Sequence, residues 1–191
     1  ILVFNFFLIC NILASFGLTI YDLKIKWGFF MVKKHKLDKV DRQILYDLQK
    51  NGRLSNVELA KNAGISAPPC LRRVRALEDA GVIKGYNAEI DPELLGYTVT
   101  VFAFVGLISQ AEVDLKKFES MVLNWEEVRE CHMLMGEIDF LLKIVSIDWD
   151  DFQKFLTSKL TPAPNVSHVK TALSIRSEKE LPGVPLTVKP S

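Results

Sequence analysis

The sequence predicts an α+β protein in which a small helical domain precedes a domain of alternating strands and helices. Residues 37–81 hold three short apolar repeats at helical spacing, each bounded by capping residues. From residue 97 the apolar period changes from 3.6 to about 2, which is typical of strands. Charge divides the chain in the same way. Residues 32–91 hold 12 Lys and Arg against 8 Asp and Glu, whereas residues 92–191 hold 10 against 14.

Composition sets the broad class of the protein. Its 191 residues are 49% apolar, which is enough to form two small domains with separate cores. Cys10, Cys70 and Cys131 are far apart in the sequence, and none has the spacing of a zinc site. We therefore expect reduced thiols in a cytoplasmic protein, with no metal and no cofactor.

Residues 1–30 differ in composition from the rest of the chain. They carry no charge before Asp22, and lysines follow the apolar run, which is long enough to span a bilayer. After Met31 the composition becomes that of an ordinary soluble start. Three interpretations follow: upstream sequence added by a mis-assigned start, a membrane anchor, or a packed extension. The first is favoured, so a membrane partner is not expected.

Two helices are predicted before residue 65. The first begins after Asp38, a good N-cap, and ends near Gly52. The second begins at a capping box formed by Ser55 and Glu58, and Gly64 ends it. The apolar positions of the two helices are Val40, Ile44, Leu45 and Leu48 in the first, and Leu54, Val57, Leu59, Ala60 and Ala63 around the second.

The third helix begins with two adjacent prolines. With Ser66 as the N-cap, Pro68 and Pro69 fall in the first turn, where a backbone N–H has no intrahelical partner. The prolines therefore stiffen the start of the helix. Spacing of 100° per residue separates two faces. Cys70, Leu71, Val74 and Leu77 face the first two helices, and Pro68, Pro69, Arg72, Arg75 and Ala76 lie opposite, with Arg73 at the flank.

The last two helices form a helix-turn-helix, because a tight turn containing Gly64 joins them. The second presents a narrow basic face with small residues at its N-terminal end, which suits the major groove of double-stranded DNA. The alternative is that the arginines only solvate an exposed face. The predicted DNA-binding residues are Arg72 and Arg75 at or near base edges, Lys61, Ser66 and Arg73 at phosphates, and Pro68 on the exposed face.

Residues 97–185 are predicted to have the element order β-α-β-β-α-β. This is the order of a ferredoxin-like fold, in which two helices lie on one face of a sheet. A linker strand is expected over residues 87–96. Phe102, Phe104, Leu141 and Ile144 are among more apolar strand residues than two helices can cover, so a homodimer through the sheets is expected. The strands are predicted over residues 98–109, 127–135, 140–147 and 166–175, and the helices over residues 111–125 and 149–161.

Three segments together resemble the Lrp/AsnC family of transcriptional regulators: LDKVDRQIL with LQKNGRLSNVELAKNAGIS, then PPCLRRVRALEDAGVIKGY, then VRECHMLMGEIDFLLKI. The resemblance covers about residues 37–185. It implies a winged helix-turn-helix over residues 31–86, a ligand-binding and dimerisation domain over residues 97–185, and a tail over residues 186–191. It also implies dimers that assemble further into tetramers or octamers, and small effectors, usually amino acids, bound between dimers.

The resemblance places the effector near the turn from Gly136 to Asp139. Gly136 would allow close approach of the backbone, and Asp139 either holds an ammonium group or is a simple turn residue. Met135 departs from the family, which often has a small hydroxyl residue there. Thr171 is a weaker candidate for a ligand-facing hydroxyl.

The expected function is a DNA-binding transcriptional regulator, not an enzyme, whose oligomeric state and DNA affinity respond to an amino acid. No nucleophile–base pair, metal spacing or phosphate loop is seen in the second half, so no catalytic residue is predicted. Two alternatives stand: a sensor that acts through protein contacts, and a membrane-tethered regulator. The expected location is the cytoplasm, with association to the nucleoid.

Overall fold

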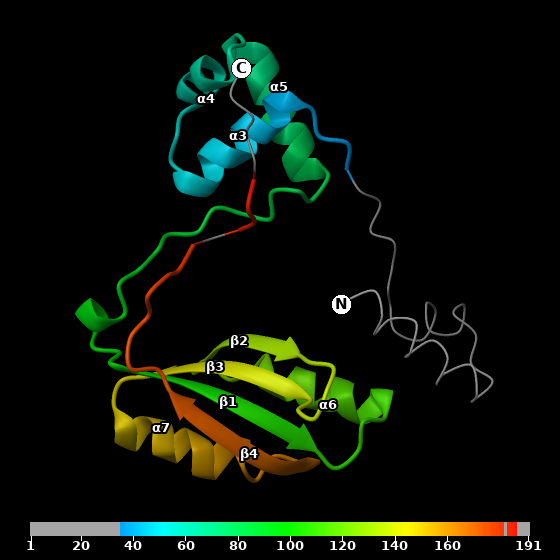
Figure 1. Ribbon diagram of the computed structural model, residues 1–191, viewed down its shortest axis with the longest axis vertical. Coiled ribbons are helices and arrows are strands. Elements are labelled where there is room, and N and C mark those ends of the chain that lie inside the picture. Colours follow the sequence, from blue (N-terminus) through cyan, green and yellow to red (C-terminus); the bar gives the residue numbers. More distant parts are fainter. Residues whose placement is uncertain (1–34, 182, 187–191) are drawn as a thin grey trace, which may run out of the picture. The chain divides into compact units, whose positions relative to one another are not determined.

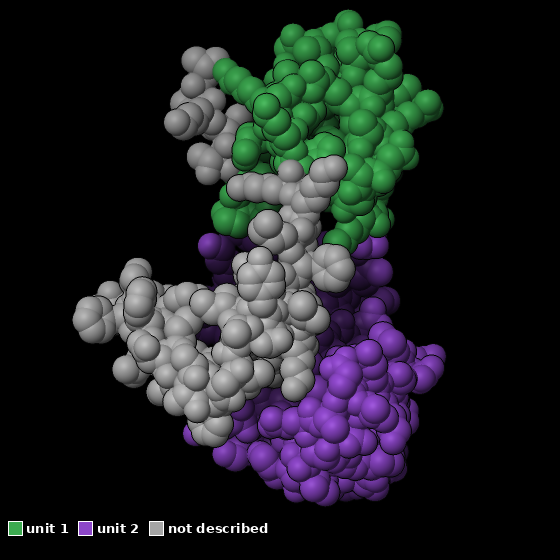
Figure 2. Space-filling model, turned by 90° about the vertical axis from the view of Figure 1, so that its right-hand side faces the viewer, with its two compact units in different colours: residues 1–86, 183–191 green, residues 87–182 purple. Residues whose placement is uncertain are grey.

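The computed structural model describes residues 35–181 and 183–186 (Figure 1), and the interpretations of residues 1–30 therefore lie outside the described residues. The chain divides into two compact units (Figure 2). Residues 1–86 and 183–191 form the first unit, and residues 87–182 form the second. Over the described part of the chain, no helix is long and apolar enough to cross a membrane.

The first unit contains the three predicted helices, α3 (Lys39–Lys50), α4 (Asn56–Ala63) and α5 (Ala67–Asp79). Each predicted N-cap holds its position. The side chain of Ser55 accepts a hydrogen bond from the Glu58 N–H, and the Glu58 carboxylate accepts one from the Ser55 N–H, so this capping box is confirmed. Asp38 caps α3 with an equivalent box.

Apolar residues from all three helices form the core of the first unit. Ile44 on α3, Leu59 on α4 and Leu77 on α5 are buried together. The predicted inward position of Leu71 is wrong in part, because 40% of its surface stays exposed. The helices therefore enclose a small core that leaves the opposite side of α5 free.

No strand occurs between α5 and residue 98 in the described chain. Residues 84–91 have no regular hydrogen bonding, and the turn η1 (Glu93–Leu95) follows. The linker strand predicted over residues 87–96 is therefore not formed within one chain. A strand requires a hydrogen-bonding partner, and this segment pairs with no strand among the described residues of the single chain.

The second unit holds one four-stranded antiparallel sheet in the order β2-β3-β1-β4. Its element order is β-α-β-β-α-β, as the sequence predicts. The elements are β1 (Val99–Leu107), α6 (Glu112–Val122), β2 (Val128–Met133), β3 (Phe140–Ser146), α7 (Trp149–Phe155), the π-helical turn η2 (Leu156–Leu160) and β4 (Val166–Leu173).

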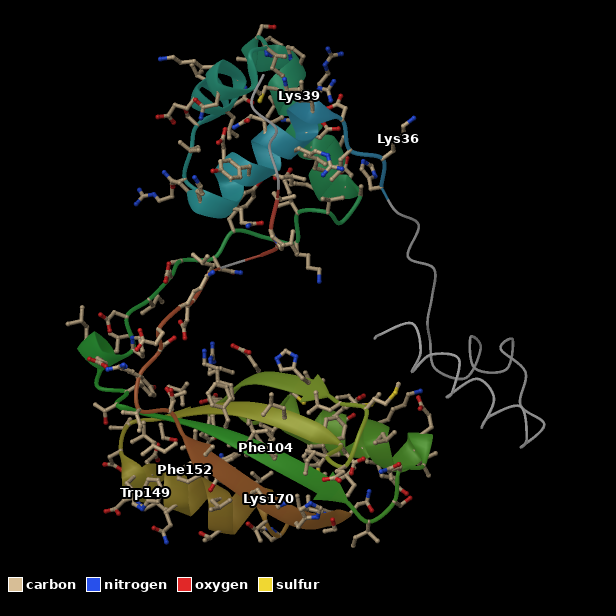
Figure 3. The ribbon with its side chains drawn as sticks, in the orientation of Figure 1. Lys36, Lys39, Phe104, Trp149, Phe152 and Lys170 are labelled. Carbon is tan, nitrogen blue, oxygen red and sulfur yellow. The ribbon has the colours of Figure 1, made fainter. Side chains whose placement is uncertain are left out.

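Helices α6 and α7 cover one face of this sheet (Figure 1). Phe118 on α6 is fully buried there, and its ring centroid lies 4.8 Å from that of Phe140 on β3. Ile144 is also fully buried in this core, so its predicted place among the uncovered residues is wrong. Trp149 is half exposed at the start of α7 (Figure 3).

Within the second unit, no helix covers the other face of the sheet. Cross-strand pairing sets Phe104 on β1 beside Leu141 on β3 and Lys170 on β4, and sets Phe102 beside Lys143. Figure 3 shows Phe104 and Lys170 on neighbouring strands. We call this surface the open sheet face, defined by Phe102, Phe104, Leu141, Lys143 and Lys170.

Candidate nucleic-acid interface and effector turn

The start of α5 leaves the hydroxyl of Ser66 without its usual partner. An N-cap side chain normally accepts a hydrogen bond from the N–H of the second or third helical residue. Those residues are Pro68 and Pro69, which have no N–H, and Ser66 accordingly makes no side-chain cap hydrogen bond. Ser66 and Pro68 are exposed. The hydroxyl is thus available to an outside partner at the end of the helix that would meet DNA first.

This difference between two capping serines gives a test. Ser66→Ala is expected to lower the free energy of unfolding by less than about 0.5 kcal/mol, because no cap hydrogen bond is lost. Ser55→Ala, which breaks a formed capping box, should cost about 1 kcal/mol. Urea denaturation measures both. In binding to duplex DNA, Ser66→Ala should have the larger effect of the two variants, with an affinity about fivefold lower than that of the unsubstituted protein. Equal destabilisation by both variants would show that the Ser66 hydroxyl caps the helix.

Two of the three arginines on α5 project from the unit without acidic partners. Arg72 and Arg75 are exposed, and neither forms an ion pair with any residue in the described ranges. Lys61, in the last turn of α4, is likewise exposed and unpaired there. These cations and the Ser66 hydroxyl form the candidate nucleic-acid interface.

Arg73 has a different environment from the one the sequence predicted. Its Nη1 lies 2.7 Å from Asp38 Oδ2 and 2.7 Å from Asp41 Oδ1, both in the capping box of α3. The pKa of Asp38 is lowered, first by the hydrogen bond from the Asp41 N–H and also by Arg73. The guanidinium therefore ties α5 to the start of α3, and the phosphate contact of Arg73 stays a prediction that would compete with this pairing.

The sequence pattern at α3 held a signal that was missed. Asp41 lies three residues after the N-cap Asp38, where a capping box places its second member, but the usual box has Ser or Thr first and Glu or Gln last. A D-x-x-D version places two carboxylates at one helix end. Such a pair attracts a cation from a neighbouring helix.

Polar contacts also fix the turn between α4 and α5. The Asn56 side-chain amide donates a hydrogen bond to the Ala67 carbonyl at 2.8 Å, which joins the start of α4 to the start of α5. Behind α5, the Tyr86 hydroxyl donates to Glu78 at 2.8 Å. Burial, followed by this bond to the Glu78 carboxylate, raises the pKa of Tyr86 to about 12. These contacts join the elements of the helix-turn-helix and do not involve Arg72 or Arg75.

The predicted effector turn lies between β2 and β3. Gly136 has φ +154°, and the space where a Cβ would stand is open to 4 Å. Asp139 is buried: its Oδ2 accepts the Leu107 N–H at 2.6 Å, and its own N–H donates to the Val105 carbonyl at 3.0 Å. The carboxylate therefore fastens the turn to the end of β1, as the turn-residue interpretation of Asp139 predicts.

The remaining two effector candidates lie in different places. Met135 is 85% exposed beside Gly136. Thr171 pairs with Ala103 in the middle of β1, on the edge strand β4, whereas the turn adjoins the opposite edge strand β2. One chain therefore does not bring Thr171 to the turn, and a shared site would need residues from another subunit.

The possible metal ligands and the two thiols in the described part of the chain form no metal site. No group of three or more His, Cys, Asp or Glu side chains there could hold a metal ion. Cys70 and Cys131 are free thiols, and burial raises the pKa of both. Cys70 is a core residue of the first unit.

Comparison with protein-family models assigns both units. Residues 37–84 match the model described as winged helix-turn-helix DNA-binding, and residues 100–184 match the model described as the Lrp/AsnC ligand binding domain. The first match contains α3, α4 and α5, and the second contains the sheet, α6 and α7.

Curated proteins and solved structures agree with these matches. The chain is 49% identical over 150 residues to the leucine-responsive regulatory protein of Rhizobium meliloti, which covers 78% of this chain and 96% of the relative. It is 40% identical over 144 residues to the Escherichia coli K12 protein of that name, and the match covers 75% of this chain and 88% of the relative. A Neisseria meningitidis transcriptional regulator, solved in complex with L-Met, superposes with a TM-score of 0.75 at 36% identity, covering 79% of this chain and 97% of that one.

Proposed function

The chain belongs to the Lrp/AsnC family of DNA-binding transcriptional regulators, and on that premise we propose how its residues bind DNA, pair subunits and sense an amino acid. The observation that carries the proposal is the start of α5. Arg72, Arg75 and an uncapped Ser66 hydroxyl project from α5, whereas Arg73 on the same helix is paired with Asp38 and Asp41.

In the proposed complex, the N-terminal end of α5 enters the major groove. Arg72 and Arg75 read base edges or lie near them, while Ser66 and Lys61 contact phosphates. Pro68 presents an exposed apolar ring with no N–H, which suits close approach to the groove wall. The prolines also reduce the conformational freedom of the free helix end, so less entropy is lost when it binds.

Pairing of subunits is proposed to occur through the open sheet face. Phe102, Phe104 and Leu141 lie there uncovered by α6 or α7, and an apolar sheet surface of this kind favours a partner. A two-fold dimer presents two copies of α5, which matches a palindromic site. Assembly of dimers into tetramers or octamers, and action on DNA in the cytoplasmic nucleoid, belong to the same proposal.

The proposed effector is an amino acid bound near Gly136 and Met135. The bound L-Met of the Neisseria meningitidis regulator supports this class of ligand. In this chain the open space at Gly136 allows close approach, and the exposed Met135 offers an apolar contact but no hydrogen-bond donor. Binding between dimers would favour one assembly over another and change how many copies of α5 engage DNA together.

The full chain tests this proposal on its own promoter region. In a gel-shift titration, we expect at least one of the twenty amino acids to change the affinity of the protein for this DNA by about 5-fold to 150-fold. The same amino acid should change the size of the oligomer. Unchanged affinity and size across all twenty would refute the effector. Weak binding that does not depend on salt would refute the DNA interface and favour a sensor that acts through protein contacts.

A further inference from the structure

Val184, in the segment of residues 183–186, is held by one side chain of α3. The Gln49 amide makes two hydrogen bonds to the backbone of Val184: its Nε2 donates to the Val184 carbonyl at 2.8 Å, and its Oε1 accepts the Val184 N–H at 3.2 Å. This arrangement copies one rung of an antiparallel sheet. Because Gln49 binds both the N–H and the C=O of Val184, the contact selects Val184 and no neighbouring residue of the segment.

The sequence around Val184 fits this contact. Gly183 has φ +75°, and a Cβ placed on it would lie 2.3 Å from Gln49 Oε1. A larger residue would therefore be strained and would also displace the Gln49 side chain. Pro185 restricts Val184 to extended conformations, which are those that present N–H and C=O for pairing.

The contact returns the chain to the unit from which it started. The chain leaves the first unit after Tyr86 and returns to it at Gly183. Between these points lies the whole ligand-binding sheet, whose edge strand β4 ends at Leu173, before residues 174–182 lead to the returning segment. The second unit is thus joined covalently to the first at both of its ends, and the segment that follows it binds the first unit through Gln49.

We propose that residues 183–186 form a releasable strap on the DNA-binding domain, and that Gln49 holds this strap so that changes in the ligand-binding sheet reach α3. This inference rests on the proposed function. The strap acts on the last turn of α3, and the first turn of α3 is joined to α5 through Asp38, Asp41 and Arg73. Helix α3 therefore connects the strap to the helix that reads DNA.

The strap is suited to release. Both hydrogen bonds to Gln49 are exposed to solvent, and the Val184 side chain is 60% exposed. Exposed hydrogen bonds contribute little net free energy, because water replaces them when they open. Elements that move in allostery come from this low-stability end of a structure.

Hydrogen exchange on the full chain tests whether the strap is held. Gln49→Ala removes the contact from α3, and Gly183→Ala removes it from the strap. Both should speed exchange of the Val184 amide roughly threefold to tenfold. Val184→Ala is the matched control, because it changes the side chain and keeps both backbone groups. Exchange in Gln49→Ala equal to that of the control would overturn the strap.

The operator gel shift, titrated with each of the twenty amino acids, tests whether the strap transmits a response. We expect Gln49→Ala to keep its effector-free affinity within about twofold and to lose most of the effector-dependent change, while Val184→Ala keeps it. Equal responses in the two variants would overturn transmission and leave the proposed function standing. Absence of any response in the unsubstituted protein would instead refute the proposed effector, and transmission with it.

Discussion

Replacing both Arg72 and Arg75 by alanine is expected to weaken operator binding by roughly a hundredfold or more while the fold stays intact. Each arginine that contacts a base contributes about 1–3 kcal/mol of discrimination, so two together account for about two powers of ten or more. The fold should survive because both side chains are exposed and form no ion pair in the described chain. Fluorescence anisotropy on the operator and on a scrambled duplex measures the loss.

The salt dependence of the single variants separates the two kinds of contact. A residue bound to phosphate reduces the log–log slope of affinity against salt by about one unit, whereas a base contact mainly reduces preference for the operator over the scrambled duplex. Arg176→Ala is the control, because Arg176 pairs with Glu178 in the second unit. Operator affinity in the double variant equal to that of the control would contradict the assigned interface.

Phe104→Glu is expected to convert the proposed dimer into a folded monomer and to reduce operator affinity by 10²-fold to 10⁴-fold. Phe104 lies at the centre of the open sheet face, so a buried carboxylate there would oppose pairing of two sheets. Lys170 on the neighbouring strand can neutralise the new charge within one monomer. The affinity falls because two linked copies of α5 bind far more tightly than one. Analytical ultracentrifugation and circular dichroism measure assembly and fold.

The matched control for this substitution is Leu123→Glu at the end of α6. Leu123 is 86% exposed, is also apolar, and lies on the helical side of the sheet. It should leave both the dimer and operator affinity unchanged. A Phe104→Glu protein that still sediments as a dimer would place the subunit interface elsewhere on the molecule.

Local signals in the sequence predicted most of the fold. Helix caps act over three or four residues. Asp38 was therefore enough to place the start of α3, and Ser55 together with Glu58 was enough to place the start of α4. The order of strands and helices along the chain followed from the change of apolar period between strand-like and helical segments. The linker strand over residues 87–96 was expected from a short extended stretch and from the family resemblance, and it is not formed within one chain, because pairing depends on a second segment that local sequence does not reveal.

The candidate sites were harder to predict, because charge partners come from distant parts of the chain. Arg73 and Arg72 are adjacent in the sequence, yet Arg73 meets Asp38 and Asp41, 35 and 32 residues away, while Arg72 stays free. The Asp139 carboxylate likewise accepts a hydrogen bond from a distant group, the backbone N–H of Leu107 on β1. Whether a charged residue is available to a ligand depends on such partners, which periodicity does not encode.

The sequence by itself determined that three capped helices precede a β-α-β-β-α-β domain, and that one face of α5 carries the exposed cations. Only the tertiary structure decided which cations remain unpaired, that the Ser66 hydroxyl lacks a cap partner, and that Val184 returns to Gln49 across 135 residues. The physical reason is range. Helix capping and apolar periodicity act within a few residues, whereas hydrogen bonds and ion pairs act wherever folding brings two groups together.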